Sequence, residues 1–196
     1  MKLTLLLGLI LIPAPLLGQS HQATASPASG ETGAIYAAAI HALFPQDQSG
    51  EKPIKVFVVE DRTRFDKYDG PAITSNQIDE ALPILPNDLL ADFLAKNAVR
   101  RKVDAFTGLP HPVKLFDSAR VGTGVPDFAF QTQFPGNCGL LSVSSIGFNR
   151  PANRALVYVA NVYGADGGKG YVIVLKRNRH GRWSVARMAM IWTWVG

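Results

Sequence analysis

The C-terminal stretch 139–196 most constrains the fold, because it alternates apolar runs with turn residues. It contains four runs rich in β-branched and aromatic residues, separated by Asn, Pro, Gly or Asp. This pattern is typical of an antiparallel meander whose strands are joined by short turns. We expect its strands at 140–148, 154–163, 170–177 and 182–195.

The last of these strands carries large apolar groups on both faces. Strict alternation places Met188, Met190, Trp192 and Trp194 on one face, opposite Trp183, Val185 and Ile191. One face should pack against helices, and the other should be covered by a long Phe-rich loop over 106–137 or form a binding surface. The aromatic candidates for that surface are Phe128 and Phe130 in the loop and Trp192 and Trp194 in the strand.

Segments upstream of the sheet predict helices. Apolar residues recur at helical spacing after Glu31 until Pro45. Thr74 and Gln77 have the spacing of a capping box, and Asn87 is a candidate N-cap before an apolar stripe. The expected helical segments span 31–44, 74–82 and 87–97.

Two further strands are expected between these helices and the meander, at 54–60 and 113–116. Together these features predict one α+β domain over 31–196, with two helices packed on an antiparallel sheet of four to five strands. Its general shape would be cystatin-like or nuclear-transport-factor-like. Residues 19–30 are small and polar and should form a flexible lead-in.

The N-terminus has the composition of a secretory signal. Lys2 precedes an apolar core that is short and interrupted by proline, so we expect a signal peptide over 1–18 and a periplasmic or secreted protein. Cleavage after Gly18 is the first choice, and cleavage after Ser20 or Ala25 is the alternative. A retained N-terminal anchor is the alternative. We otherwise expect membrane contact only during export.

Charge and cysteine content limit the partners. The net charge is +5, but the basic clusters are short and lack interleaved aromatic residues, so no nucleic-acid partner is expected. Cys138 is the only cysteine, so the chain has no internal disulfide. We interpret Cys138 as a buried or chance thiol and not as a nucleophile.

No motif for catalysis or cofactor binding occurs. The chain lacks H-E-x-x-H, G-x-S-x-G, C-x-x-C and EF-hand patterns, and we predict no metal and no cofactor. The Gly-rich segment 164–170 is followed by a strand and not by a helix, so it indicates a hairpin loop and not a phosphate loop. The remaining titratable candidates are His111 and Asp127 in the long loop, and Glu60 and Asp61 at a strand end.

Several short segments resemble a family of uncharacterised exported bacterial proteins. They are Phe134-Pro135-Gly136, Ile146-Gly147-Phe148-Asn149, Ala155-Leu156-Val157-Tyr158-Val159, Gly170-Tyr171, Gly181-Arg182-Trp183-Ser184-Val185 and Trp194-Val195, and the likeness also touches 92–97. Members often have a cysteine pair in the Gly-rich loop, and this chain has none there. The resemblance implies a fold and an exported location, but no activity.

Two hypotheses for function follow. We favour a non-enzymatic binding or interaction module with an unknown protein or small ligand as partner. The rival is a small hydrolase with its site between the 106–137 loop and the sheet. The hydrolase hypothesis requires at least two of the titratable candidates within hydrogen-bonding or one-water reach of each other in a pocket.

Overall fold

The computed structural model describes residues 29–45, 53–66, 72–103, 106–120, 127–164 and 167–195. Within these ranges the chain forms four α-helices, one 3-10 turn and seven strands. The helical elements are α1 (Ser29–Leu43), α2 (Ser75–Ala81), α3 (Asn87–Asn97), η1 (Ser118–Arg120) and α4 (Phe128–Gln133). The strands are β1 (Val56–Glu60), β2 (Val113–Phe116), β3 (Asn137–Val143), β4 (Gly147–Phe148), β5 (Arg154–Val162), β6 (Gly167–Arg177) and β7 (Trp183–Val195).

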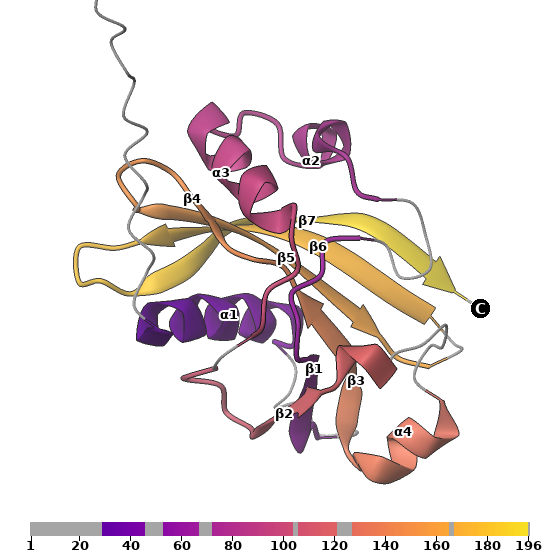
Figure 1. Ribbon diagram of the computed structural model, residues 1–196. Helices are drawn as coiled ribbons and strands as arrows, with labels where there is room; N and C mark the ends of the chain where they lie inside the picture. Colours follow the sequence, from indigo (N-terminus) through magenta and orange to yellow (C-terminus); the bar gives the residue numbers. More distant parts are fainter. Residues whose placement is uncertain are drawn as a thin grey trace, which may run out of the picture.

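The strands form one open, mostly antiparallel sheet in the order β2-β1-β3-β5-β6-β7, with β4 paired to β5 (Figure 1). The α+β prediction and the C-terminal meander are confirmed. The predicted strand number was too low, because β1 and β2 extend the sheet beyond β3 and pair in parallel. Parallel strands need long crossover connections, and the segment between β1 and β2 supplies one that contains α2 and α3.

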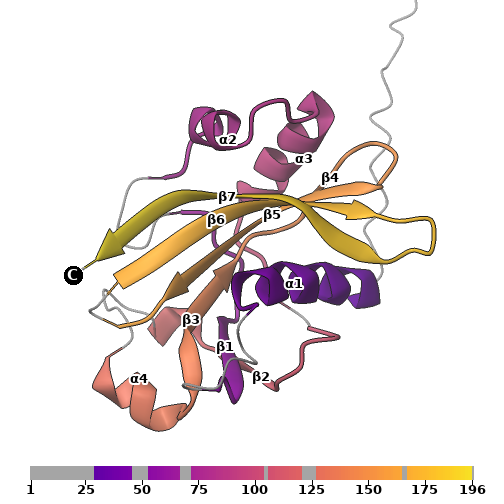
Figure 2. The ribbon, with the colours of Figure 1, turned by 180° about the vertical axis from the view of Figure 1, so that it is seen from behind.

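Helices cover both faces of this sheet, as Figures 1 and 2 show from opposite sides. Ile35 and Ile40 of α1 are fully buried against a layer that includes Ile173 of β6. On the other face, Leu89 and Phe93 of α3 are fully buried in the layer around Leu156, Tyr158 and Val172. Burial of each such side chain contributes about 1.5–3 kcal/mol, so α1 and α3 are fixed by their apolar stripes.

The 106–137 segment differs from the long loop that we predicted, and the predicted helix count was therefore also too low. Asp127 accepts a hydrogen bond from the backbone N–H of Phe130 at 3.0 Å and begins α4. Phe130 is only 5% exposed, and its ring lies 5.5 Å from that of Phe116 and 5.1 Å from that of Phe134. A carboxylate N-cap and one buried aromatic anchor are enough to fix a helix of this length.

The predicted alternation of β7 was also wrong, because β7 has two bulges. Gly170 pairs with Trp192 while Tyr171 pairs with Met190, so one residue between them has no direct partner on β6. The bulge turns the tryptophans to the α2–α3 face, where Trp192 packs against the buried layer. Met190 pairs with a residue of the α1 side and is 50% exposed. The bulge therefore directs Trp192 to the α2–α3 face of the sheet and Met190 to the α1 face.

Candidate functional site

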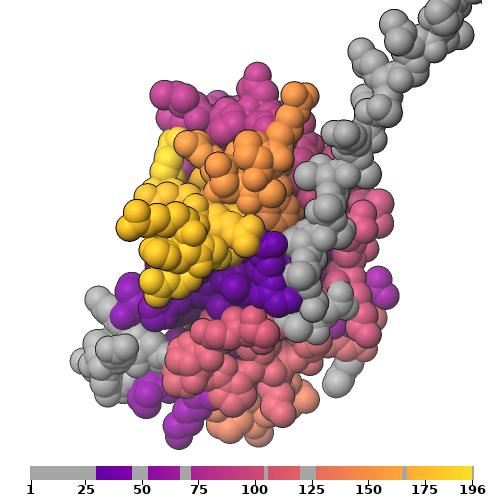
Figure 3. Space-filling view, turned by 90° about the vertical axis from the view of Figure 1, so that its left-hand side faces the viewer, coloured from indigo at the N-terminus to yellow at the C-terminus, as the bar shows by residue number. Residues whose placement is uncertain are grey.

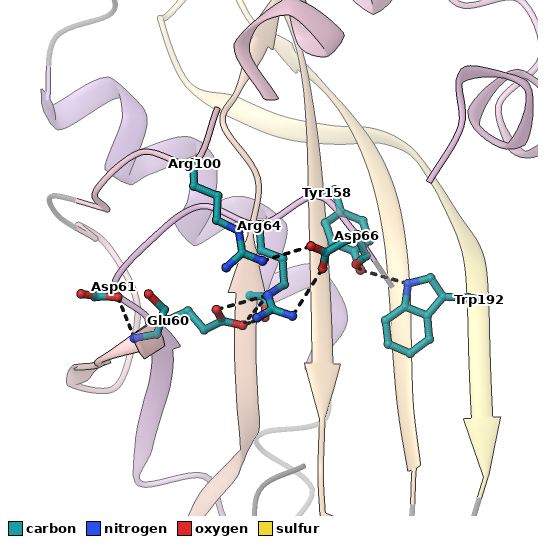
Figure 4. Close-up of polar contacts among 9 residues, drawn as sticks. Glu60, Asp61, Arg64, Asp66, Arg100, Tyr158 and Trp192 are labelled. Atoms are coloured by element: carbon teal, nitrogen blue, oxygen red, sulfur yellow. Dashed lines mark hydrogen bonds and ion pairs between the residues drawn. The ribbon is translucent and has the colours of Figure 1, made fainter. Parts of the chain in front are cut away.

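A buried carboxylate lies at the end of β1. The side chain of Glu60 is fully buried, accepts a hydrogen bond of 2.5 Å from Ser142 Oγ, and lies 3.1 Å from Nε of Arg64 (Figure 4). Burial raises the pKa of Glu60, while the Arg64 guanidinium and the Ser142 hydroxyl act in the opposite direction. Glu60, a titratable candidate at the strand end in the sequence, is therefore a buried carboxylate.

The ion pair continues towards β7 through a chain of polar contacts. Arg64 lies 3.4 Å and Arg100 lies 3.0 Å from the two carboxylate oxygens of Asp66. The Tyr158 hydroxyl donates to the backbone carbonyl of Asp66 at 2.8 Å and accepts from Nε1 of Trp192 at 2.9 Å. Burial raises the pKa of Tyr158 well above its ordinary value, so this hydroxyl stays protonated. The guanidinium groups of Arg64 and Arg100 balance the carboxylates of Glu60 and Asp66. We therefore interpret this chain of contacts as a structural link between β1, β5 and β7.

Asp61 points away from Glu60 although the two are adjacent in sequence. Its carboxylate accepts from the backbone N–H of Ser118 at 2.9 Å and begins the η1 turn. This hydrogen bonding lowers the pKa of Asp61. The predicted Glu60–Asp61 pair is thus divided between a buried ion pair and a turn.

His111 lines a cavity of about 370 Å³ at the other end of β1 and β2. Its ring lies 5.9 Å from the ring of Phe57. Because β1 and β2 are parallel and Phe57 pairs with Val113 while Glu60 pairs with Phe116, His111 and Glu60 lie at opposite ends of this strand pair. The other lining residues are Phe106, Gly108, Leu109, Pro112, Val113 and Leu115.

The remaining predicted residues have separate roles. Asp127 is exposed and caps α4, and Phe128 beside it is 86% exposed. Phe130 lies in the core, while Trp192 and Trp194 are half-buried against it. Cys138 lies half-buried in β3 and packs against the core on the α1 side. The structure therefore does not bring His111, Asp127 and the β1 carboxylates together in one pocket.

A second cavity, of about 330 Å³, lies at the end of the sheet where β5 begins and β6 ends. Arg154 of β5 pairs directly with Lys176 of β6, and Arg187 of β7 pairs with Val174, two residues before Lys176 in β6. All three cations line the cavity, from three adjacent strands. We call Arg154, Lys176 and Arg187 the basic pocket.

Side-chain alternation places the basic pocket on the face that α2 and α3 cover. Arg154 lies two residues before Leu156, and Lys176 two residues after Val174, and both of these apolar residues belong to the layer under α3. Arg187 donates from Nη1 to the backbone carbonyl of Pro83, between α2 and α3, at 2.7 Å. The cavity is thus lined by β5, β6, β7 and Asn153, and Arg187 links it to the α2–α3 connection.

The charge of the basic pocket is not balanced by a carboxylate among the described residues. Arg154, Lys176 and Arg187 form no ion pair there, whereas Arg177, which also lines the cavity, pairs with Glu31 of α1 at 3.3 Å. Like charges directly opposite on neighbouring strands destabilise a sheet. An anion placed between them would remove this repulsion.

Sequence reasoning missed this pocket. It judged the basic clusters too short for a nucleic-acid site and assigned no role to Arg154 or Arg187. One signal was available, since Arg187 is the only charged residue within the otherwise apolar and small-residue strand β7.

No family model, curated protein or solved structure matches this chain. The resemblance to exported bacterial proteins therefore stays a prediction. Across the described ranges, no three residues among His, Cys, Asp and Glu are grouped so that they could hold a metal ion. None of the helices in the described part of the chain combines the length and apolarity needed to cross a membrane.

Proposed function

We propose that this protein is a non-enzymatic binding module, exported to the periplasm or secreted, that holds an anionic ligand in the basic pocket. The observation that carries the proposal is the convergence of Arg154, Lys176 and Arg187 in one cavity without a carboxylate partner among the described residues. Guanidinium groups recognise carboxylate and phosphate oxygens through paired hydrogen bonds, and the lysine adds a point charge.

The pocket has a size and a rigidity that suit a small anionic group. Its volume of about 330 Å³ lies at the lower end of the range for ligand sites. Val174 and Ala186 contribute apolar surface beside the cations. Arg187 is held by the carbonyl of Pro83, so less side-chain entropy is lost when a ligand binds.

The hydrolase hypothesis has no comparable support. Its candidates are separated by the strand pair β1–β2, and Glu60 and Asp61 are each engaged in structural contacts.

The finer prediction of a cystatin-like or nuclear-transport-factor-like shape rests on α1, which lies across one face of the antiparallel strands (Figure 2).

Isothermal titration calorimetry with pyrophosphate at low ionic strength tests this function. We expect binding by the unmodified protein and its loss in the double variant R154Q/K176Q. The matched control is K102Q/K114Q, which removes the same charge from two exposed positions outside the pocket. No binding by the unmodified protein, or equal losses in the two double variants, would show that the pocket is not an anion site.

A further inference from the structure

Ile84 is an unusual residue in the α2–α3 connection, next to the proline that Arg187 of the basic pocket contacts. It is 94% exposed, and its φ of 68° lies in the left-handed region that β-branched residues avoid. It follows Pro83, whose carbonyl accepts the hydrogen bond from Arg187 of the pocket. Neither the strained backbone nor the exposed apolar side chain of Ile84 stabilises the folded protein. Backbone strain of this kind clusters at binding sites.

The positive charge around the pocket extends over the whole end of the molecule. The turn after β4 and the turn between β6 and β7 lie side by side there, joined by a backbone hydrogen bond of 2.9 Å from Arg177 to Asn153. Figure 3 shows this end, with the two turns in orange and gold between α3 above and α1 below. The turns add three exposed cations, Arg150, Arg179 and Arg182.

The sequence offers little negative charge to balance this surface. From residue 128 to the C-terminus the chain has eight Lys and Arg residues and a single acidic residue, Asp166. Two carboxylates contact this region in the described residues. Glu31 is paired with Arg177, and Asp88 at the start of α3 accepts from the backbone N–H of Arg150 at 2.8 Å. A flat anionic surface fits such a distribution better than an isolated small anion.

We propose that the ligand of the basic pocket is the phosphate headgroup of an anionic phospholipid, and that this end of the molecule docks on the bilayer surface with Ile84 inserted at the interface. This inference rests on the proposed anion-binding function. Basic residues near an anionic bilayer gain electrostatic attraction, and an apolar side chain gains by leaving water for the acyl boundary. It goes beyond our expectation of membrane contact only during export.

Two other ligands fit the surface less well. Free phosphate would use the pocket but would give no role to the exposed Ile84. A single-stranded nucleic acid would need exposed aromatic rings for stacking, and Trp183, the aromatic residue nearest the β6–β7 turn, donates to Glu31 on the opposite face at 3.2 Å.

Co-sedimentation with phosphatidylcholine vesicles, with and without phosphatidylglycerol, tests the inference. We expect the protein to bind only the vesicles that contain phosphatidylglycerol, and to be released by salt. R154Q/K176Q should weaken vesicle binding by about fivefold for each charge removed. Ile84→Asn, which suits the left-handed backbone, should weaken it by roughly tenfold and leave pyrophosphate binding unchanged.

The matched control for Ile84 is Val99→Asn, which replaces another exposed apolar residue, 66% exposed, after the end of α3. This control should bind vesicles as the unmodified protein does. Equal binding to both vesicle types, no effect of Ile84→Asn, or binding to single-stranded DNA without vesicle binding would overturn the inference. If pyrophosphate binding persists in any of these cases, only the lipid assignment fails; if it is absent from the unmodified protein, the proposed function fails.

Discussion

Replacement of Arg64 by methionine should destabilise the protein strongly at neutral pH. The Arg64 guanidinium lies 3.1 Å from a Glu60 carboxylate that is fully buried, and its own side chain is 12% exposed. Methionine fills much of the same volume but leaves the carboxylate without its counter-charge. Removal of one partner from a buried ion pair costs about 3–5 kcal/mol in the free energy of unfolding.

The stability lost in Arg64→Met should depend on pH, because the Glu60 carboxylate is buried. Burial raises the pKa of Glu60 in the folded state above the value of 4.5 expected in the unfolded chain. Between these two pKa values the folded state binds more protons, so the free energy of unfolding falls as the pH rises through that window. Without Arg64 the folded pKa rises further. The variant should therefore lose more stability at about pH 7 than at about pH 4, where Glu60 is protonated in both states.

Urea denaturation at the two pH values measures this difference. At neutral pH the expected loss corresponds to a fall of roughly 6–20 °C in Tm for a domain of this size. The control is Lys96→Met, which breaks a partly exposed pair with Asp92 and should cost no more than about 1 kcal/mol. A cost below about 1 kcal/mol for Arg64→Met, or an equal cost at both pH values, would refute the reasoning.

Two further substitutions test the packing of the sheet. Gly147→Ala should destabilise by about 1–3 kcal/mol, because a Cβ there would lie 2.6 Å from the Cα of Phe93. Gly30→Ala, whose Cβ meets no atom within 4 Å, should be neutral or stabilising when both glycine variants are compared by thermal denaturation. Tyr158→Phe removes the acceptor of Trp192 Nε1 and should cost about 1–3 kcal/mol, with a change in tryptophan fluorescence; an unchanged spectrum and stability would contradict this contact.

Local signals predicted the elements of this fold well. The capping box is confirmed: Thr74 Oγ1 accepts from the Gln77 backbone N–H at 3.3 Å, and Gln77 Oε1 accepts from the Thr74 backbone N–H at 3.0 Å. Asn87 is the first residue of α3 and not its cap, since Pro86 occupies the N-cap position without a side-chain hydrogen bond. Turn residues and apolar runs act over a few positions, so a single sequence is sufficient to locate them.

The basic pocket could not be predicted in the same way. Arg154, Lys176 and Arg187 are far apart in sequence and meet only through the register of β5, β6 and β7. That register includes a bulge in β7 between Val185 and Arg187, which shifts the side chains after it by one position until the second bulge between Met190 and Trp192. Nothing in the local pattern of the strand fixes the position of such a bulge.

The central claim is that an anion binds between Arg154, Lys176 and Arg187. Amide ¹H–¹⁵N correlation spectra recorded during a pyrophosphate titration test it directly, because they show which of the two cavities responds. We predict saturable shifts at the start of β5, the end of β6 and residues 185–188 of β7, with none in R154Q/K176Q. Shifts confined to the cavity around His111, or no saturable shifts, would contradict the claim.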